Sequence, residues 1–139
     1  MGNRRNARES ALKILYEVDI KKSKDSSEID EILNDYWERD NLNANDDIKN
    51  FASEIVRGVL ANIVQIDGYI SKFTKKWDIT RIDKVEKNIL RIGIFEIIFF
   101  GKVPTVVSIN EAIEIAKKYG AADADKFING ILDQIRKKQ

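Results

Sequence analysis

The sequence predicts an all-α protein with about seven helices, and three observations support this fold class. The 139-residue chain contains a single proline, Pro104, and only seven glycines, so long windows run without a residue that breaks helices. In most of these windows apolar residues recur at the three- and four-residue spacing of one helical face. Hydrophobic residues make up 43% of the chain and charged residues 34%, a balance typical of a globular protein with one packed core.

The first three helices are predicted from apolar stripes in the N-terminal part of the chain. A helix over about residues 5–20 has a stripe formed by Ala7, Ala11, Ile14, Leu15 and Val18. Ser26 and Ser27 are candidate caps of a second helix, whose stripe consists of Ile29, Ile32, Leu33 and Tyr36. After a polar linker over residues 39–46, the third helix begins near Asp46 and includes Ile63, with an apolar face broad enough to be buried on more than one side.

The middle of the chain predicts a short fourth helix and a long fifth one. A break near residues 65–68 starts the fourth helix, which ends near Trp77. The fifth runs from Thr80 or Arg81 to Phe100, and its second half is apolar nearly all round, as expected of a core helix. Its β-branched residues would also permit a strand, but its length and the spacing of its basic residues favour a helix.

Two more helices are predicted after the loop over residues 101–105, where glycine and proline end one helix before the next begins. Ser108 followed by Glu111 forms a capping-box pattern at the start of the sixth helix, and Gly120 ends that helix. Asp123 is the candidate cap of the last helix, which leads into the basic residues RKKQ.

The residue types exclude several kinds of chemistry. The chain has no His and no Cys, which removes disulfides, thiolate nucleophiles, Cys-ligated zinc and the commonest acid-base group near neutral pH. The carboxylate pairs Glu111 with Glu114 and Asp123 with Asp125 could share a proton or a hard cation, but capping and helix-surface roles already explain them. No GxGxxG, GxxxxGK[ST] or GxSxG pattern occurs. We therefore expect no catalytic centre, no metal and no cofactor.

The start of the chain bears on its location. The segment MGNRRNARES is not followed by the apolar stretch of a secretory signal, and no apolar run approaches membrane-spanning length. The lack of Cys also fits a reducing compartment. We expect a cytoplasmic protein that does not bind a membrane.

Charge is distributed unevenly along the chain, although the net charge is only +1. Nine acidic residues and a single basic residue, Arg39, lie between Asp25 and Asp47, so the rest of the chain is positively charged. This segregation indicates a positive side that attracts phosphate and a negative side that repels it. The alternative is that both are ordinary solvated faces.

Three arginines at the start of the first predicted helix are the most informative basic residues. Arg4, Arg5 and Arg8 precede the first acidic residue, Glu9, and they oppose the helix dipole, which favours acids in the first turn. Arginine suits phosphate recognition because its planar guanidinium offers several donors. The pattern predicts a phosphate-binding segment, with a frayed basic tail as the alternative.

Two aromatic residues are candidate contact residues. Counting about 100° per residue places Tyr16 opposite the apolar stripe of the first helix, so its ring should be accessible, beside Leu12, to a protein partner. Phe127 lies on the flank of the last stripe next to Lys126, where the ring can stack on a base while the lysine meets phosphate. A phenylalanine in such a position is more often part of the core.

Four segments carry a resemblance to a known family. They are RRNARESALKILY at residues 4–16, VEKNILRIGIFEI at 85–97, VPTVVSINEAIEIAKKYG at 103–120 and DKFINGILDQI at 125–135. Together they resemble NusB, a family of bacterial transcription antitermination factors. The resemblance covers nearly the whole chain, around a divergent stretch over residues 21–50.

This resemblance implies a fold, a role and a set of contact residues. The fold would be one NusB-like domain over residues 1–139, made of two packed small helical bundles over about 1–66 and 67–139. The role would be that of a non-catalytic scaffold in the RNA polymerase antitermination complex of ribosomal RNA operons. The protein would bind single-stranded boxA-like RNA together with the small-subunit ribosomal protein also called NusE. By matching positions, RNA would contact Arg4, Arg5, Arg8, Lys117, Lys126 and Phe127, and the ribosomal protein would contact Tyr16 and Glu86.

The sequence also departs from the family pattern at two positions. Asn6 stands where many members have another arginine, and Ala124 replaces a frequent serine, so the RNA affinity stays open. A monomer and a homodimer are both compatible with the free protein. Two other functions are alternatives: the RNA-binding module found at the N-terminus of certain ribosomal RNA cytosine methyltransferases, and a helical adaptor that binds proteins only.

Overall fold

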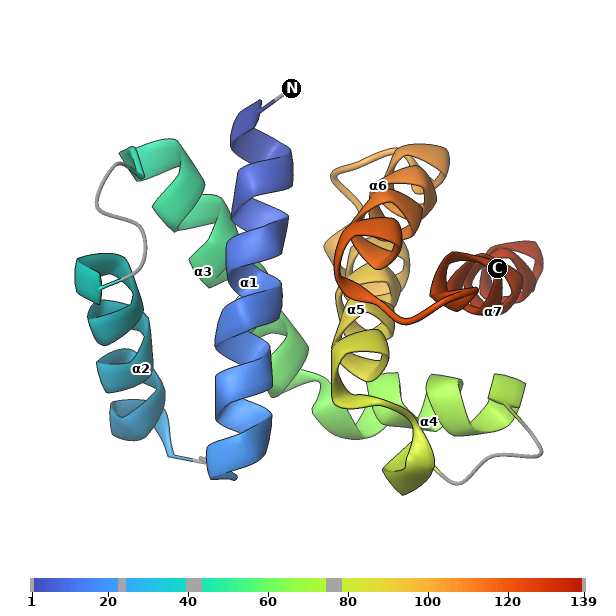
Figure 1. The fold of residues 1–139 in the computed structure, drawn as a ribbon, viewed down its shortest axis with the longest axis horizontal. Helices are drawn as coiled ribbons and strands as arrows, with labels where there is room; N and C mark the ends of the chain where they lie inside the picture. The colour runs from blue at the N-terminus through green and yellow to red at the C-terminus, as the bar shows by residue number, and fades with distance from the viewer. Residues whose placement is uncertain (1, 23–24, 40–43, 75–78, 139) are drawn as a thin grey trace. The chain divides into compact units, whose positions relative to one another are not determined.

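The computed structural model describes residues 2–22, 25–39, 44–74 and 79–138, and these form helices and connecting turns without any strand (Figure 1). The all-α fold predicted from the sequence is therefore confirmed in the described ranges. The elements are α1 (Gly2–Lys21), α2 (Ser26–Arg39), α3 (Asp46–Ala61), α4 (Ile63–Thr74), the 3-10 turn η1 (Ile79–Arg81), α5 (Lys84–Ile94), the π-helical segment η2 (Phe95–Phe100), α6 (Thr105–Tyr119) and α7 (Ala124–Lys137).

The chain divides into two compact units, Met1–Arg57 and Gly58–Gln139. The division falls inside α3, whereas the resemblance implied a boundary near residue 66.

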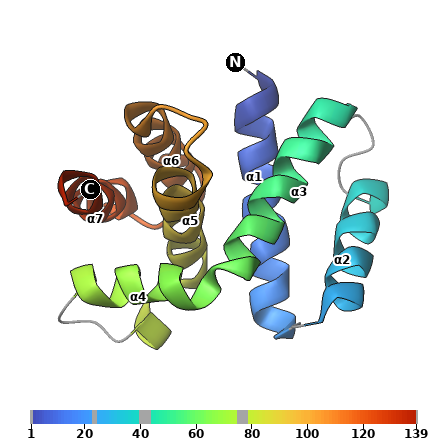
Figure 2. The same cartoon turned by 180° about the vertical axis from the view of Figure 1, so that it is seen from behind.

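In the first unit α1 lies alongside α2, and α3 crosses behind α1, as Figures 1 and 2 show. The apolar stripes predicted for the first two helices are buried, and so is most of the stripe on α3. Tyr36 of α2 is also buried, and its hydroxyl donates a hydrogen bond to Ser10 Oγ at 3.3 Å. A buried hydroxyl thus finds a partner, as a packed helical core requires.

The cap of α2 is Asp25, so the prediction that Ser26 or Ser27 caps this helix is wrong. The Asp25 carboxylate accepts hydrogen bonds from the backbone N–H of Ser27 at 2.9 Å and of Glu28 at 3.2 Å. A carboxylate at this end also interacts favourably with the helix dipole. The Ser27 hydroxyl and these two N–H groups hold the pKa of Asp25 below its ordinary value.

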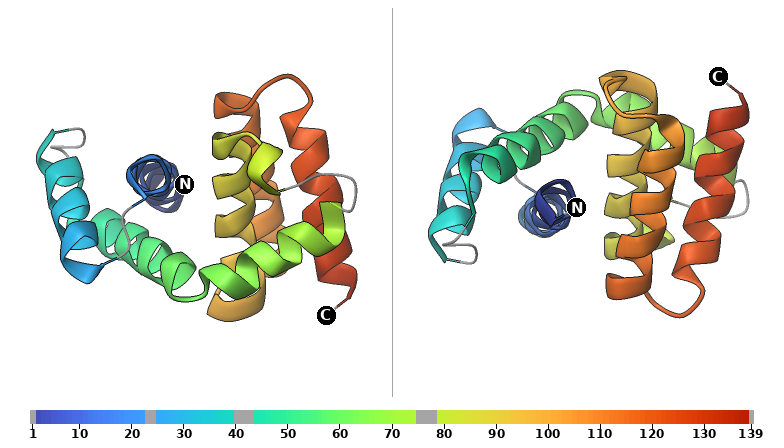
Figure 3. Two further views of the ribbon diagram at one scale, coloured as in Figure 1. Left: turned by 90° about the horizontal axis from the view of Figure 1, so that it is seen from below. Right: turned by 90° about the horizontal axis from the view of Figure 1, so that it is seen from above.

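In the second unit α5, α6 and α7 lie side by side, and α4 crosses them and contacts α5 and α7 (Figure 3). The predicted break near residues 65–68 is misplaced, because α4 already begins at Ile63 and continues through that segment. The Asn62 side chain marks the true break, where it donates to the Gly58 carbonyl at 2.8 Å. The predicted end of this helix near Trp77 lies outside the described residues.

The long fifth helix predicted up to Phe100 is three elements in the structure. After η1, α5 begins behind Asp83, whose carboxylate accepts from the backbone N–H of Val85 at 3.1 Å and of Glu86 at 3.3 Å. The last six residues of the predicted helix form the π-helical segment η2. This segment ends at Gly101, which has a left-handed backbone conformation. Apolar periodicity does not distinguish a 3-10 turn, an α-helix and a π-helix, since all three present similar apolar faces.

The capping box predicted at Ser108 is wrong. The sixth helix begins one turn earlier, directly after Pro104, whose fixed φ suits a helix start. Ser108 lies inside α6, is buried, and donates from its hydroxyl to Glu96 Oε1 at 2.8 Å. Asp123 does occupy the cap position of α7, but its side chain makes no capping hydrogen bond there, so that predicted role is wrong as well.

Candidate nucleic-acid and partner interface

The N-terminal arginines are organised by one aromatic ring of α3. The guanidinium carbon of Arg4 lies 4.0 Å from the centroid of the Phe51 ring, and that of Arg8 lies 5.3 Å from it. These are cation–π distances. Arg4 is exposed and Arg5 half-buried, but Arg8 is only 3% exposed. Arg4 and Arg5 therefore present cationic surface, whereas Arg8 has little surface to offer a ligand.

A polar hollow of about 370 Å³ lies beside Arg4. Its lining comes from the start of α1 and from one face of α3, and consists of Asn3, Arg4, Asp47, Asn50, Phe51 and Glu54. Two carboxylates thus stand next to an arginine that the sequence assigned to phosphate. The sequence gives no sign of this neighbourhood, because Asp47 and Glu54 are far from Arg4 along the chain.

The candidate RNA-binding residues of the second unit lie on the adjacent helices α6 and α7. Lys117 is in the last turn of α6, and its Nζ is 3.4 Å from a Glu114 carboxylate oxygen. The Lys126 side chain on α7 is 80% exposed, with its Nζ 3.6 Å from Asp123. Such exposed pairs contribute only about 0–1 kcal/mol, so both ammonium groups can exchange their partner for a phosphate. Phe127 is half-buried, which agrees with its predicted place on the flank of the stripe.

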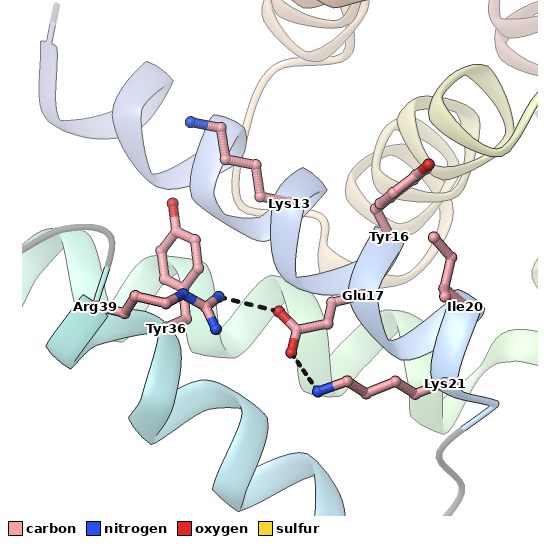
Figure 4. A pocket seen from close by; sticks show the side chains of 7 residues that line it. All are labelled: Lys13, Tyr16, Glu17, Ile20, Lys21, Tyr36 and Arg39. Atoms are coloured by element: carbon pink, nitrogen blue, oxygen red, sulfur yellow. Dashed lines mark hydrogen bonds and ion pairs between the residues drawn. The ribbon is translucent and has the colours of Figure 1, made fainter.

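A groove of about 340 Å³ in the first unit has Tyr16 among its lining residues (Figure 4). Tyr16 is 38% exposed and Ile20 is 51% exposed, so the prediction of an accessible tyrosine ring is confirmed. Leu12 is buried and does not form the expected neighbouring contact surface. The groove is lined by Lys13, Tyr16, Glu17, Ile20, Lys21, Tyr36 and Arg39, the last two of which come from α2.

One ionic cluster holds the polar side of this groove. The Glu17 carboxylate accepts from Lys21 Nζ at 2.8 Å and from Arg39 Nη2 at 3.2 Å, which joins α1 to α2 (Figure 4). Burial by itself raises the pKa of Glu17, but the hydrogen bonds and charges of Lys21 and Arg39 outweigh it and hold the pKa below its ordinary value. The groove therefore combines a partly apolar floor with a fixed charged rim.

Glu86 has a structural role that the sequence did not reveal. It lies half-buried in the first turn of α5 and accepts a hydrogen bond from the backbone N–H of Ala121, in the loop between α6 and α7. Burial raises the pKa of Glu86, the Asp83 carboxylate adds to this effect, and the Ala121 hydrogen bond offsets only part of it. Glu86 thus ties the start of α5 to a neighbouring loop.

The predicted site residues are divided between the two units. Arg4, Arg5, Arg8 and Tyr16 belong to the first, and Glu86, Lys117, Lys126 and Phe127 belong to the second. Within the first unit the structure brings Arg4 and Arg8 together on one ring, while Tyr16 lies three turns further along α1. A single RNA surface built from both units stays a prediction.

Two further features of the described residues bear on function. No described helix is both long and apolar enough to cross a membrane. Among the same residues, no group of three or more acidic side chains is placed to hold a metal ion.

Comparisons with known proteins point to one family. The model of the NusB family matches residues 5–137. The transcription antitermination protein NusB of Thermodesulfovibrio yellowstonii is 41% identical over 140 aligned residues, which cover 98% of this chain and 93% of that protein. The protein of the same name from Acetivibrio thermocellus is 40% identical and covers 96% of this chain and 88% of its own length.

Solved structures show the same similarity in three dimensions. NusB of T. maritima superposes with a TM-score of 0.83 at 36% identity, over 98% of this chain and 92% of that one. A crystal structure of the antitermination factors NusB and NusE in complex with double-stranded RNA contains a chain that superposes with a TM-score of 0.87 at 30% identity, over 100% and 99% of the two chains.

Proposed function

Because this chain belongs to the NusB family, we propose that it is a transcription antitermination factor that binds boxA-type RNA of ribosomal RNA operons together with ribosomal protein NusE. The observation that carries the proposal is the similarity to antitermination proteins over nearly the full chain. The related structure that contains NusB, NusE and RNA supports both partners. The protein acts in the cytoplasm, as part of the RNA polymerase antitermination complex.

The RNA is bound by cationic and aromatic side chains from both units. Arg4 and Arg5 of α1 and Lys117 and Lys126 of α6 and α7 supply positive charge at exposed or half-exposed positions. Phe127 offers part of its ring to an unstacked base, which is a common way to recognise single-stranded RNA. Arg8 contributes mainly through the arginine cluster on Phe51, since it is almost fully buried.

The ribosomal protein binds through Tyr16 and Glu86. Tyrosine is enriched at protein interfaces because its ring supplies contact area and its hydroxyl a polar contact. The groove beside Tyr16 adds the exposed side chain of Ile20 and the charged rim at Glu17. These features suit a partner that inserts an apolar side chain and pairs with a rim charge.

The protein works as a scaffold without a reaction of its own. Its chain has no His or Cys, and two of its candidate carboxylates, Glu114 and Asp123, form surface ion pairs with Lys117 and Lys126. A methyltransferase module would require a separate α/β domain that binds S-adenosylmethionine, so calorimetry with that cofactor should give no binding heat.

The decisive test is a gel shift with boxA RNA and a scrambled RNA, each with and without the ribosomal protein. We expect a shift with boxA RNA that the ribosomal protein strengthens. Arg5→Ala and Phe127→Ala should weaken binding at two salt concentrations while circular dichroism shows an intact fold. Arg81→Ala and Phe99→Ala, which change the same residue types outside the predicted surface, should bind as the wild type does.

Three outcomes would count against parts of the proposal. Unchanged RNA binding by Arg5→Ala and Phe127→Ala would refute the assignment of the site. Tight binding of the ribosomal protein without any RNA binding would favour the protein-only adaptor. No binding of either partner would refute the proposed function as a whole.

A further inference from the structure

The carboxylates beside Arg4 are unexpected at a surface that binds RNA. Asp47 and Glu54 line the same hollow as the Arg4 guanidinium, and negative side chains repel the phosphates of a nucleic acid. A phosphate is therefore a poor occupant of this hollow. The other part of an RNA strand that a protein binds is an unpaired base, which has a flat uncharged ring and an edge with donors and acceptors.

We propose that the hollow lined by Asn3, Arg4, Asp47, Asn50, Phe51 and Glu54 is a subsite for one unpaired nucleobase that carries an exocyclic amino group. The inference rests on the proposed function, and it adds the place at which the protein recognises a single base. It concerns the first unit alone, since all six residues belong to it.

The stacking platform of this subsite is Arg4, held in place by Phe51. Phe51 is only 6% exposed, so its ring has little face left for a base. The Arg4 guanidinium lies over that ring at 4.0 Å, and Arg4 itself is exposed. Bases stack on guanidinium planes as they do on aromatic rings. A base can thus add a third layer above Phe51 and Arg4.

The rim of the hollow supplies hydrogen-bond acceptors for the edge of the base. Asp47, Asn50, Phe51 and Glu54 follow one another at the spacing that places residues on one face of α3. A carboxylate accepts from an amino group of a base, and an asparagine amide both donates and accepts. Uracil presents carbonyl oxygens instead of an amino group, so these carboxylates disfavour it.

The size of the hollow agrees with a single base. Its volume of about 370 Å³ lies at the lower end of the range of about 300–1,000 Å³ found for small-molecule sites. The hollow therefore suits one flat ring rather than a stretch of strand. The neighbouring nucleotides contact the cationic side chains of the surface.

The test separates stacking from charge by replacing Arg4 with lysine. Lysine keeps the positive charge and loses the guanidinium plane. The probes are a labelled single-stranded boxA RNA and a series of the same RNA with one abasic nucleotide moved along it, measured by fluorescence anisotropy with the wild type and Arg4→Lys. Arg81→Lys, an exposed arginine outside the hollow, is the matched control.

We expect the wild type to lose affinity by about 5- to 150-fold when the base at one particular position is removed, as a stacked base contributes about 1–3 kcal/mol. In Arg4→Lys, removal of the base at that position should leave the RNA affinity nearly unchanged, a ratio of about onefold. Arg81→Lys should keep the wild-type profile. At the same position, uracil should bind more weakly than cytosine or adenine, and Asp47→Asn should narrow this difference.

The proposal is overturned if Arg4→Lys has the same abasic profile as the wild type, because Arg4 then acts through its charge alone. The proposed preference for a base with an amino group is overturned if Asp47→Asn leaves the discrimination against uracil unchanged. If the wild type binds no boxA RNA, the proposed function fails and the subsite fails with it. That result appears with the unmodified protein and is distinct from the others.

Discussion

A single buried hydrogen bond supports a prediction at the scale of the residue. The Ser108 hydroxyl donates to Glu96 at 2.8 Å, and both side chains are buried. Hydrogen bonds to charged groups contribute about 1.5–3 kcal/mol, and a buried carboxylate that loses a donor keeps its desolvation cost. We therefore expect Ser108→Ala to lower the free energy of unfolding by about 1–3 kcal/mol, measured by urea denaturation.

The matched control is Ser71→Ala, which removes an exposed hydroxyl from α4. This change should stay within about 0.5 kcal/mol of the wild type. Equal unfolding midpoints for Ser108→Ala and the wild type would show that the Glu96 carboxylate does not depend on this donor.

For single residues, the sequence predicted positions on one helix but not contacts between helices. The exposure of Tyr16 and the flanking place of Phe127 follow from the angular position of each residue on its own helix. The contact of Arg4 with Phe51 and the hydrogen bond from Ala121 to Glu86 join different elements. Such contacts depend on how helices pack, so the periodicity of one segment contains no information about them.

At the scale of the element, two glycines should respond to alanine with opposite signs. Gly68 lies within α4, and a Cβ added there meets nothing within 4 Å. Alanine favours the helix, so Gly68→Ala should stabilise by about 0.5–1 kcal/mol. Gly101 ends η2 with a φ of +67°, where an added Cβ is strained, so Gly101→Ala should destabilise by about 1–2 kcal/mol.

Parallel urea titrations of the two variants test this pair. Both changes add the same methyl group without a clash, so the comparison isolates the backbone conformation. A midpoint that falls for Gly68→Ala or rises for Gly101→Ala would contradict the assigned conformations.

The elements also show where sequence patterns reach their limit. Apolar stripes located the helices, because burial of one face is what forms them. The caps were harder to predict, since several polar residues near each end compete for the same backbone N–H groups. Asp25 prevails over Ser26 and Ser27 at α2, and Pro104 starts α6 ahead of Ser108. The outcome depends on the local geometry of the turn, which periodicity does not describe.

At the scale of the whole molecule, the sequence predicted the segregation of charge but not its fine distribution. The acidic stretch forms α2, with exposed Glu28, Glu31, Asp35 and Glu38, as a solvated acidic face. Asp47 belongs to the same stretch by sequence, yet it lies in the hollow beside Arg4. Proximity in space, rather than along the chain, therefore decides whether an acid repels the RNA backbone or reads a base.

The acidic face of α2 should slow RNA association without affecting which RNA is chosen. Glu31, Asp35 and Glu38 are exposed there, and their repulsion of a polyanion acts over about a Debye length of 10 Å at 0.1 M salt. The triple change Glu31→Gln, Asp35→Asn and Glu38→Gln should raise the association rate of boxA and scrambled RNA equally, by about two- to tenfold at low salt. Stopped-flow fluorescence should show this gain disappearing at high salt, with dissociation rates unchanged.

The double change Glu31→Asp and Glu38→Asp keeps the charge and should leave all rates as in the wild type. A slower dissociation of boxA RNA alone would instead mean that these acids contact the bound RNA directly.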